Sequence, residues 1–166
     1  YATSYIPTSG GTATRLGDIV SGAGDASTFN DSEGVLFAEI SALTDDGTAR
    51  TISINNGASS NRVFIQFRST TGQVNSGVIV GGALQGSSMS FAVPQTSNIK
   101  MAIKYKLNDF ALWVNGVEVG TSSGNVFPSN TLNDLSFDSG SGAEDFYGKT
   151  SQIQVFNTAL TDAELT

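Results

Sequence analysis

The clearest pattern in this chain is an alternation of apolar and polar side chains in the stretch IKMAIKYKLNDFALWVNGVEVGT, residues 99–121. A period of two is typical of a β-strand that buries one face. Asn115 and Gly116 predict a two-residue hairpin turn, because both tolerate the positive φ that such a turn requires. Leu107 and Asn108 predict an earlier turn. The stretch therefore predicts a meander of three antiparallel strands.

The two turns fix the register of this meander. The predicted pairs are Val114 with Val117, Trp113 with Glu118, Leu112 with Val119, Tyr105 with Phe110, Ile103 with Leu112, and Ala102 with Trp113. One face then carries Ile99, Met101, Ile103, Tyr105, Phe110, Leu112, Val114, Val117 and Val119. The other face carries Lys100, Ala102, Lys104, Ala111, Trp113, Glu118 and Gly120. The first face predicts a core with Leu112 at its centre, and the second leaves one large aromatic side chain among small and charged neighbours.

Short β-prone stretches with turn residues between them recur along the whole chain. We expect further strands over residues 3–6, 12–16, 34–43, 50–55, 62–69, 73–80, 89–93, 135–137 and 146–156, and a loop over 21–33. Thr161 and Glu164 form a capping-box pattern that predicts one short helical turn near the C-terminus. The pattern predicts an all-β protein, an antiparallel two-sheet β-sandwich in a single domain spanning residues 1–166. A parallel β-helix is disfavoured because no coil length repeats.

Composition removes several kinds of chemistry. The chain has no cysteine and no histidine, which excludes nucleophiles and bases of those types, the usual zinc sites and haem attachment. A metal site would need oxygen ligands, so calcium is the possible cofactor. The weak calcium candidates are Asp45, Asp46, Asp138 and Asp145, with Glu144 beside the last. Solvated turn residues are the favoured interpretation of these positions, since no known ligand spacing joins them.

Charge and hydropathy narrow the range of partners. Fifteen acidic and eight basic residues give a net charge of −7, and the cations do not cluster, so nucleic acid is a poor partner. No apolar run approaches the roughly 20 residues of a membrane span, which argues against membrane insertion. The chain begins at Tyr1 rather than at a methionine, and we expect it to be the C-terminal domain of a longer protein.

Three segments carry a resemblance to a known family. The segments FALWVNGVEVG and FYGKTSQIQVFNTALTDAEL resemble the end of laminin-G-like, concanavalin A-like lectin/glucanase domains. The segment ATSYIPTSGGTATRLGD resembles the opening of such domains in bacteriophage tail fibre proteins. The resemblance implies a jelly-roll sandwich and carbohydrate binding. It also implies a place at the tip of a homotrimeric fibre on a virion, or on an extracellular surface. It transfers no contact residues.

Candidate glycan contacts come from the non-core faces. Trp113 has small neighbours that would leave its indole open to a sugar ring, with Glu118 and Lys104 near enough to bind hydroxyl groups. The competing interpretation, slightly favoured, is that the 21–33 loop or another subunit covers the indole. Gln66 and Arg68 share the non-core face of their strand, and they either line a groove or lie beneath a loop.

Three functions follow from these observations. A non-catalytic domain that binds polysaccharide or a host-cell glycan is the first. A fibre-capping or trimerisation domain without a ligand is the alternative. A glycoside hydrolase or lyase is disfavoured, because no strand carries a pair of carboxylates at i, i+2 spacing and Glu39 and Glu118 stand alone.

Overall fold

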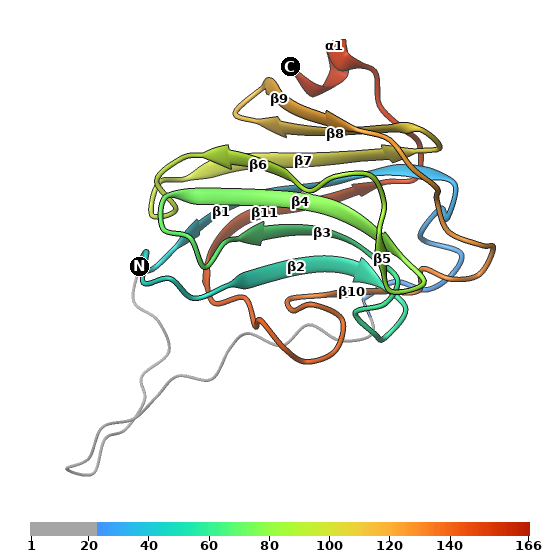
Figure 1. Cartoon of the computed structure of the whole chain (residues 1–166), viewed down its shortest axis with the longest axis horizontal. Helices are drawn as coiled ribbons and strands as arrows, with labels where there is room; N and C mark the ends of the chain where they lie inside the picture. Colours follow the sequence, from blue (N-terminus) through green and yellow to red (C-terminus); the bar gives the residue numbers. More distant parts are fainter. Residues whose placement is uncertain (1–22) are drawn as a thin grey trace.

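Residues 23–166, which the computed structural model describes, form two antiparallel sheets that pack face to face (Figure 1). Sheet A has the order β10-β2-β3-β4-β5, with β6 paired to β4 as well. Sheet B has the order β11-β1-β7-β8-β9. The strands are β1 Glu33–Ala42, β2 Arg50–Asn55, β3 Arg62–Phe67, β4 Gln73–Val80, β5 Ala83–Leu84, β6 Met89–Ala92, β7 Ile99–Lys106, β8 Asp109–Val114, β9 Val117–Ser122, β10 Asp134–Ser136 and β11 Gly148–Phe156. The chain is thus an all-β jelly-roll sandwich, as its sequence pattern predicts.

The predicted strands within the described residues are all present, with small differences in their bounds. Strands β2 and β4 match the predicted ranges, β3 ends at Phe67, and β11 begins at Gly148. The two-residue strand β5 was not predicted. The predicted strands at 3–6 and 12–16 lie outside the described residues. The described part of the 21–33 loop is irregular up to β1, apart from one bridge from Ala23 to Leu135.

The predicted register of the meander is confirmed at five of its six pairs and is wrong at the sixth. Trp113 lies opposite Glu118, but Leu112 lies opposite Gly120 instead of Val119, because a β-bulge interrupts the β8–β9 ladder at this point. The bulge also changes the facing of Gly120, which the alternation placed on the outer face. A Cβ there would lie 3.2 Å from the Cβ of Met89, a core residue. Val117, predicted for the core face, is 60% exposed at the end of the sheet.

The core lies between the sheets and takes one face of almost every strand. Sheet A contributes Ile52, Ile54, Val63, Ile65, Phe67, Val74 and Val78, and sheet B contributes Leu36, Ala38, Ile40, Ile99, Met101, Ile103, Tyr105, Phe110, Leu112 and Val114. Tyr105 keeps its hydroxyl satisfied by donating to the carbonyl oxygen of Asn30 at 2.7 Å, and burial raises its pKa. Gly34 is required beside it, because a Cβ there would lie 2.7 Å from that hydroxyl oxygen.

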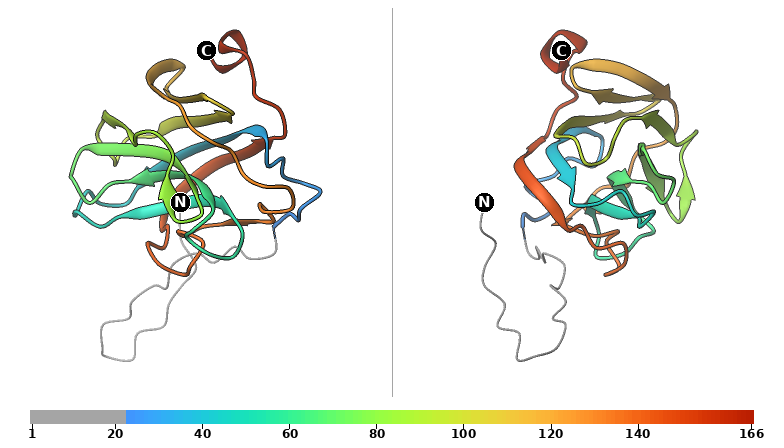
Figure 2. Two further views of the ribbon diagram at one scale, coloured as in Figure 1. Left: turned by 45° about the vertical axis from the view of Figure 1, so that its right-hand side comes forward. Right: turned by 90° about the vertical axis from the view of Figure 1, so that its left-hand side faces the viewer.

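The helix α1, Asp162–Leu165, is a single turn on the outer side of sheet B (Figure 2). The predicted capping box is confirmed. The Glu164 carboxylate accepts hydrogen bonds from the hydroxyl and the backbone N–H of Thr161, and these bonds hold its pKa below the ordinary value. No helix within residues 23–166 has the length and apolar character to cross a membrane.

Leu112 provides a test of the core. It is fully buried and sits opposite Ile103, so Leu112→Ala should lower the free energy of unfolding by about 2–5 kcal/mol through lost burial and a residual cavity. Val117→Ala, on the adjoining strand at an exposed position, should change it by less than about 0.5 kcal/mol. Urea unfolding followed by circular dichroism measures both, and equal effects would mean that the facing of the meander is misassigned.

Candidate glycan-binding faces

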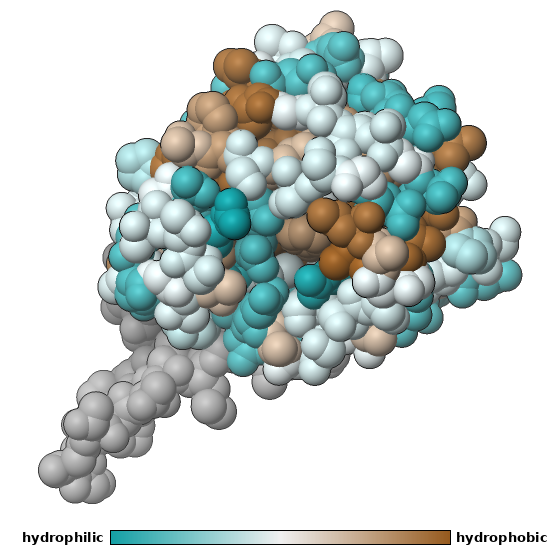
Figure 3. All heavy atoms as spheres, viewed as in Figure 1, coloured by the Kyte–Doolittle hydropathy of each residue, from teal (hydrophilic) through white to brown (hydrophobic). Residues whose placement is uncertain are grey.

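The outer face of sheet A carries a band of polar side chains. They point away from the interior because side chains alternate between the two faces of each strand. Because Ile65 and Phe67 point inward, their neighbours on β3 point outward. We call this surface the polar face; it comprises Thr51, Ser53, Asn55, Arg62, Phe64, Gln66, Arg68, Gln73, Asn75, Gly77 and Ser90. Figure 3 views the molecule from this side and shows a hydrophilic stripe beside an apolar patch near β4 and β5.

The loop between β10 and β11 covers one part of the polar face. Its Glu144 carboxylate accepts hydrogen bonds from the Thr51 hydroxyl at 2.8 Å and from the Gln66 amide at 2.9 Å. The carbonyl oxygen of Ser139 accepts a hydrogen bond from the Arg62 guanidinium at 2.8 Å. Burial lowers the pKa of that guanidinium, and the negative charges of Glu144 and Asp138 act in the opposite direction. Gln66 is therefore already engaged by the protein's own carboxylate.

Beyond the loop, the polar face keeps hydrogen-bonding groups with spare capacity. Asn75 is 8% exposed and donates to the Ser88 hydroxyl, but its amide oxygen has no partner among the described residues. Arg68 donates to the Gln73 side chain at 3.1 Å and to the Ser90 hydroxyl at 3.3 Å. No carboxylate of residues 23–166 forms an ion pair with Arg68.

An apolar element adjoins these polar groups. The Phe64 ring packs over Gly77, and the Arg62 guanidinium lies 5.0 Å from the centre of that ring. A Cβ on Gly77 would lie 3.1 Å from the Leu84 side chain, so Phe64 and Leu84 flank the same point. Leu84 is 43% exposed and gives this corner of the face an apolar surface.

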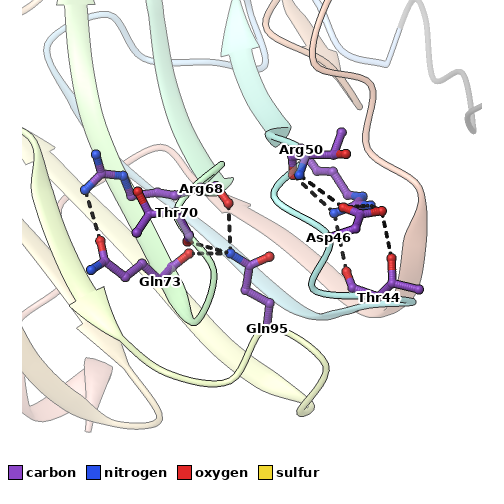
Figure 4. A network of polar contacts seen from close by, with 8 residues as sticks. Thr44, Asp46, Arg50, Arg68, Thr70, Gln73 and Gln95 are labelled. Atoms are coloured by element: carbon purple, nitrogen blue, oxygen red, sulfur yellow. Dashed lines mark hydrogen bonds and ion pairs between the residues drawn. The ribbon is translucent and has the colours of Figure 1, made fainter.

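Three backbone carbonyl oxygens surround the side-chain amide of Gln95 at one end of the polar face. The side-chain amide of the fully buried Gln95 donates to the carbonyl oxygens of Arg68, Thr70 and Gln73, at 2.9, 3.3 and 2.8 Å (Figure 4). One side chain thus holds both ends of the loop between β3 and β4, and with it the backbone of Arg68.

Trp113 lies on the opposite side of the sandwich and is not open. It is 7% exposed, and its indole N–H is buried without a partner among the described residues. We call the residues around it the Trp113 cluster; they are Val35, Ala102, Ala111 and Trp113, with Phe37, Phe156, Leu160 and Leu165 packed against them. The favoured interpretation of the sequence was that another segment covers the indole. In the structure this segment is the C-terminal one, residues 157–166, rather than the described part of the 21–33 loop.

The two charged residues predicted beside Trp113 differ in their surroundings. Lys104 is 8% exposed, and its Nζ lies 3.3 Å from a carboxylate oxygen of Asp109 and 3.3 Å from one of Asp162. Burial lowers the pKa of Lys104, but the two carboxylates outweigh it and the net pKa is raised. Glu118 is exposed opposite Trp113. The five predicted contact residues therefore do not form one site, because Gln66 and Arg68 lie on sheet A and the other three on sheet B.

The acidic calcium candidates do not gather into a metal centre. Asp46 forms an ion pair with the buried Arg50 at 2.8 Å, and hydrogen bonds from Thr44 and Arg50 hold its pKa well below the ordinary value (Figure 4). Asp45 accepts a hydrogen bond from the backbone N–H of Gly72. Asp138 and Asp145 belong to the loop before β11. Within residues 23–166, no group of three or more carboxylates is placed to hold an ion.

Arg62 and Asn75 on the polar face, and Gln95 beside it, were not singled out from the sequence. Arg62 was within reach, because extending the β3 alternation by two positions from Phe64 places it on the same face. Asn75 and Gln95 carried no local signal. Asn75 donates to Ser88, just before β6, and Gln95 donates to backbone carbonyl oxygens between the end of β3 and the start of β4.

The family of this chain follows from its match to a known family model. A laminin-G-type family model, described as the Concanavalin A-like lectin/glucanases superfamily, matches residues 23–166. The chain belongs to this superfamily. The resemblance noted in the sequence is thereby confirmed for the jelly-roll domain. A comparison with curated protein sequences gave no significant match.

Similar solved structures share the fold of the superfamily at low identity. The heptameric SAP-like pentraxin of Limulus polyphemus is 16% identical with a TM-score of 0.68, covering 93% of this chain and 76% of that chain. The CBM40 of the Ruminococcus gnavus IT-sialidase, solved with α2,3-sialyllactose, is 17% identical with a TM-score of 0.66, covering 91% and 95%. Sheep galectin-11 is 8% identical with a TM-score of 0.55, covering 86% and 99%.

The burial of Trp113 predicts its fluorescence. The emission of this single tryptophan should be blue-shifted and protected from acrylamide in the native chain. Leu165→Ala should shift the emission to longer wavelength and raise quenching, since Leu165 packs against the cluster. Ala163→Ser, at an exposed position of α1, is the control and should leave the spectrum unchanged. A red-shifted, freely quenched native spectrum would contradict the cover.

A substitution at Gln95 tests how much its contacts with the carbonyl oxygens contribute to stability. Gln95→Glu would place a carboxylate against the three carbonyl oxygens and should cost about 3–5 kcal/mol of unfolding free energy at pH 7. The loss should shrink as the pH falls, because the introduced group has a raised pKa in the folded state and can donate once protonated. Gln152→Glu, at an exposed position of β11, is the control. Urea titrations at pH 5 and pH 7 measure both, and a pH-independent loss would contradict this account.

Proposed function

We propose that this domain is a non-catalytic carbohydrate-binding domain whose ligand lies across the polar face. The observation that carries the proposal is the partly exposed guanidinium of Arg68, which has no ion pair among residues 23–166 and donates to Gln73 and Ser90, on the same face as the exposed apolar side chain of Leu84. Sugar hydroxyl groups both donate and accept, and the C–H faces of a sugar ring pack on apolar side chains. Amide and guanidinium groups beside an apolar surface are what such a ligand needs.

The similar structures support the same class of ligand. The CBM40 neighbour was solved with sialyllactose, and galectin-11 was solved in complex with glycerol. The face of sheet B is less suitable, because the C-terminal segment covers Trp113 and two carboxylates hold Lys104.

We also propose that the domain does not hydrolyse its ligand. A glycosidase needs two carboxyl groups about 5–9.5 Å apart across the scissile bond. Glu39 on β1 and Glu118 on β9 are separated by three strand spacings, roughly 14 Å at about 4.8 Å each. Asp109 and Asp162 each lie 3.3 Å from Lys104 Nζ and are held by these ion pairs, and Glu144 is already bonded to Thr51 and Gln66.

We also propose the setting that the sequence implied, a receptor-binding domain at the tip of a phage tail fibre or on a bacterial surface. Its support is the resemblance of the first residues to tail fibre domains. In that setting the ligand would be a host polysaccharide or cell-surface glycan, and the parent fibre would be a homotrimer. Light scattering of the isolated chain tests whether this domain itself contributes to the trimer.

A glycan array followed by calorimetry tests the proposal. Wild-type chain should bind at least one oligosaccharide, and Arg68→Ala should weaken that binding by about tenfold or more, the loss expected for a hydrogen bond to a charged group. Lys149→Ala, an exposed cation on the other sheet, is the matched control and should bind like wild type. Thermal midpoints close to wild type would show that both variants fold.

The possible outcomes separate the function from the site. An array without a bound glycan would count against carbohydrate binding. A bound glycan that is insensitive to Arg68→Ala and also to Asn75→Ala would remove the ligand from the polar face. Release of reducing sugar from a bound polysaccharide would contradict the non-catalytic proposal.

A further inference from the structure

A cavity of about 560 Å³ lies between the C-terminal segment and the outer face of sheet B. Members of the Trp113 cluster form its apolar lining, and Lys100, Asn115, Gln154 and Glu164 stand among its polar lining residues. Pockets that hold small ligands typically measure about 300–1,000 Å³ and combine apolar walls with a few polar groups. This cavity has both properties and lies on the opposite side of the sandwich from the polar face.

The polar lining residues indicate the charge of the ligand. Asn115 uses its side-chain oxygen to accept from the backbone N–H of Lys100, which leaves its NH₂ group to donate. Glu164 uses one carboxylate oxygen for the capping box and keeps the other as an acceptor. An anionic ligand would meet Glu164, and a cationic ligand would meet Lys100. A hydroxyl group, which donates and accepts, fits the mixed set.

The indole of Trp113 supplies the second observation. Its N–H is buried and has no partner among the described residues, although the ring contributes to the cavity lining. The N–H itself is fully buried, so a ligand in the cavity would contact the ring rather than the N–H.

We propose that this cavity is a second binding site, for an uncharged amphipathic molecule with an apolar chain or ring and a hydroxyl-bearing head. The apolar part packs within the Trp113 cluster, and the head meets Lys100, Asn115, Gln154 and Glu164. Alkyl and aryl glycosides are ligands of this class. The site shares no residue with the polar face and does not depend on the function proposed there.

Fluorescence titration with n-octyl β-D-glucoside, kept below its micelle concentration, tests the site on the full chain. The emission of Trp113 should change saturably. Methyl β-D-glucoside, which has the head without the chain, should give no change at equal concentration. Octanoate, which has a similar chain with an anionic head, should bind more weakly because it faces Glu164.

Gln154→Phe is the decisive variant, because it places an aromatic ring at the cavity lining from an exposed position of β11. It should weaken the octyl glucoside response by about tenfold or more, as an overfilled site loses its ligand. Gln152→Phe is the matched control, two residues away on the same strand face and outside the cavity lining, and should leave the response unchanged.

Three results would overturn this site. They are the lack of a saturable response, an equal response in Gln154→Phe and wild type, and an equal response to methyl and octyl glucoside. Arg68→Ala distinguishes the two proposals. It should leave the octyl glucoside titration unchanged even where it abolishes glycan binding, and Gln154→Phe should leave binding of glycan-array ligands unchanged.

Discussion

Burial of one face of every long strand between the two sheets is the constraint on which the rest of this structure depends. Because successive side chains point to opposite faces, placing Ile65 in the core turns Phe64 and Gln66 outward. The same rule places Ala102 and Trp113 together on the outside of sheet B. The positions of both candidate sites are therefore consequences of how the interior is filled.

The outer faces are completed by segments that follow the meander in the chain. The loop before β11 docks on sheet A through Glu144 and Ser139, with polar contacts that leave Arg68 partly exposed. The C-terminal segment docks on sheet B through two leucines and the Asp162 ion pair, and it leaves a cavity instead of a solid contact. The polar face presents Arg68, Gln73 and Ser90 at its accessible end, whereas the Trp113 side holds a partly open cavity with both apolar and polar lining residues.

Membership of the superfamily identifies the fold. The location of the binding site depends on the side chains of this particular chain. The similar structures share at most 17% of their residues with this chain, so their ligand contacts cannot be transferred by position. What distinguishes this chain is local: an arginine without an acidic partner among the described residues, a buried amide oxygen left unpaired, and a tryptophan under its own C-terminal segment. The two proposed sites lie on opposite faces, so a ligand at one would not block the other.

The sequence by itself determined the strands, five of six meander pairs and the capping box at Thr161, because periodicity, turn residues and caps act over a few residues. The tertiary structure alone decided the bulge that moves Gly120 to the core side, the carbonyl cage around Gln95, and the cover on Trp113. It also decided that Gln66 and Trp113 lie on different sheets. These features depend on contacts between segments far apart in the chain, and a local pattern carries no information about which segment arrives opposite it.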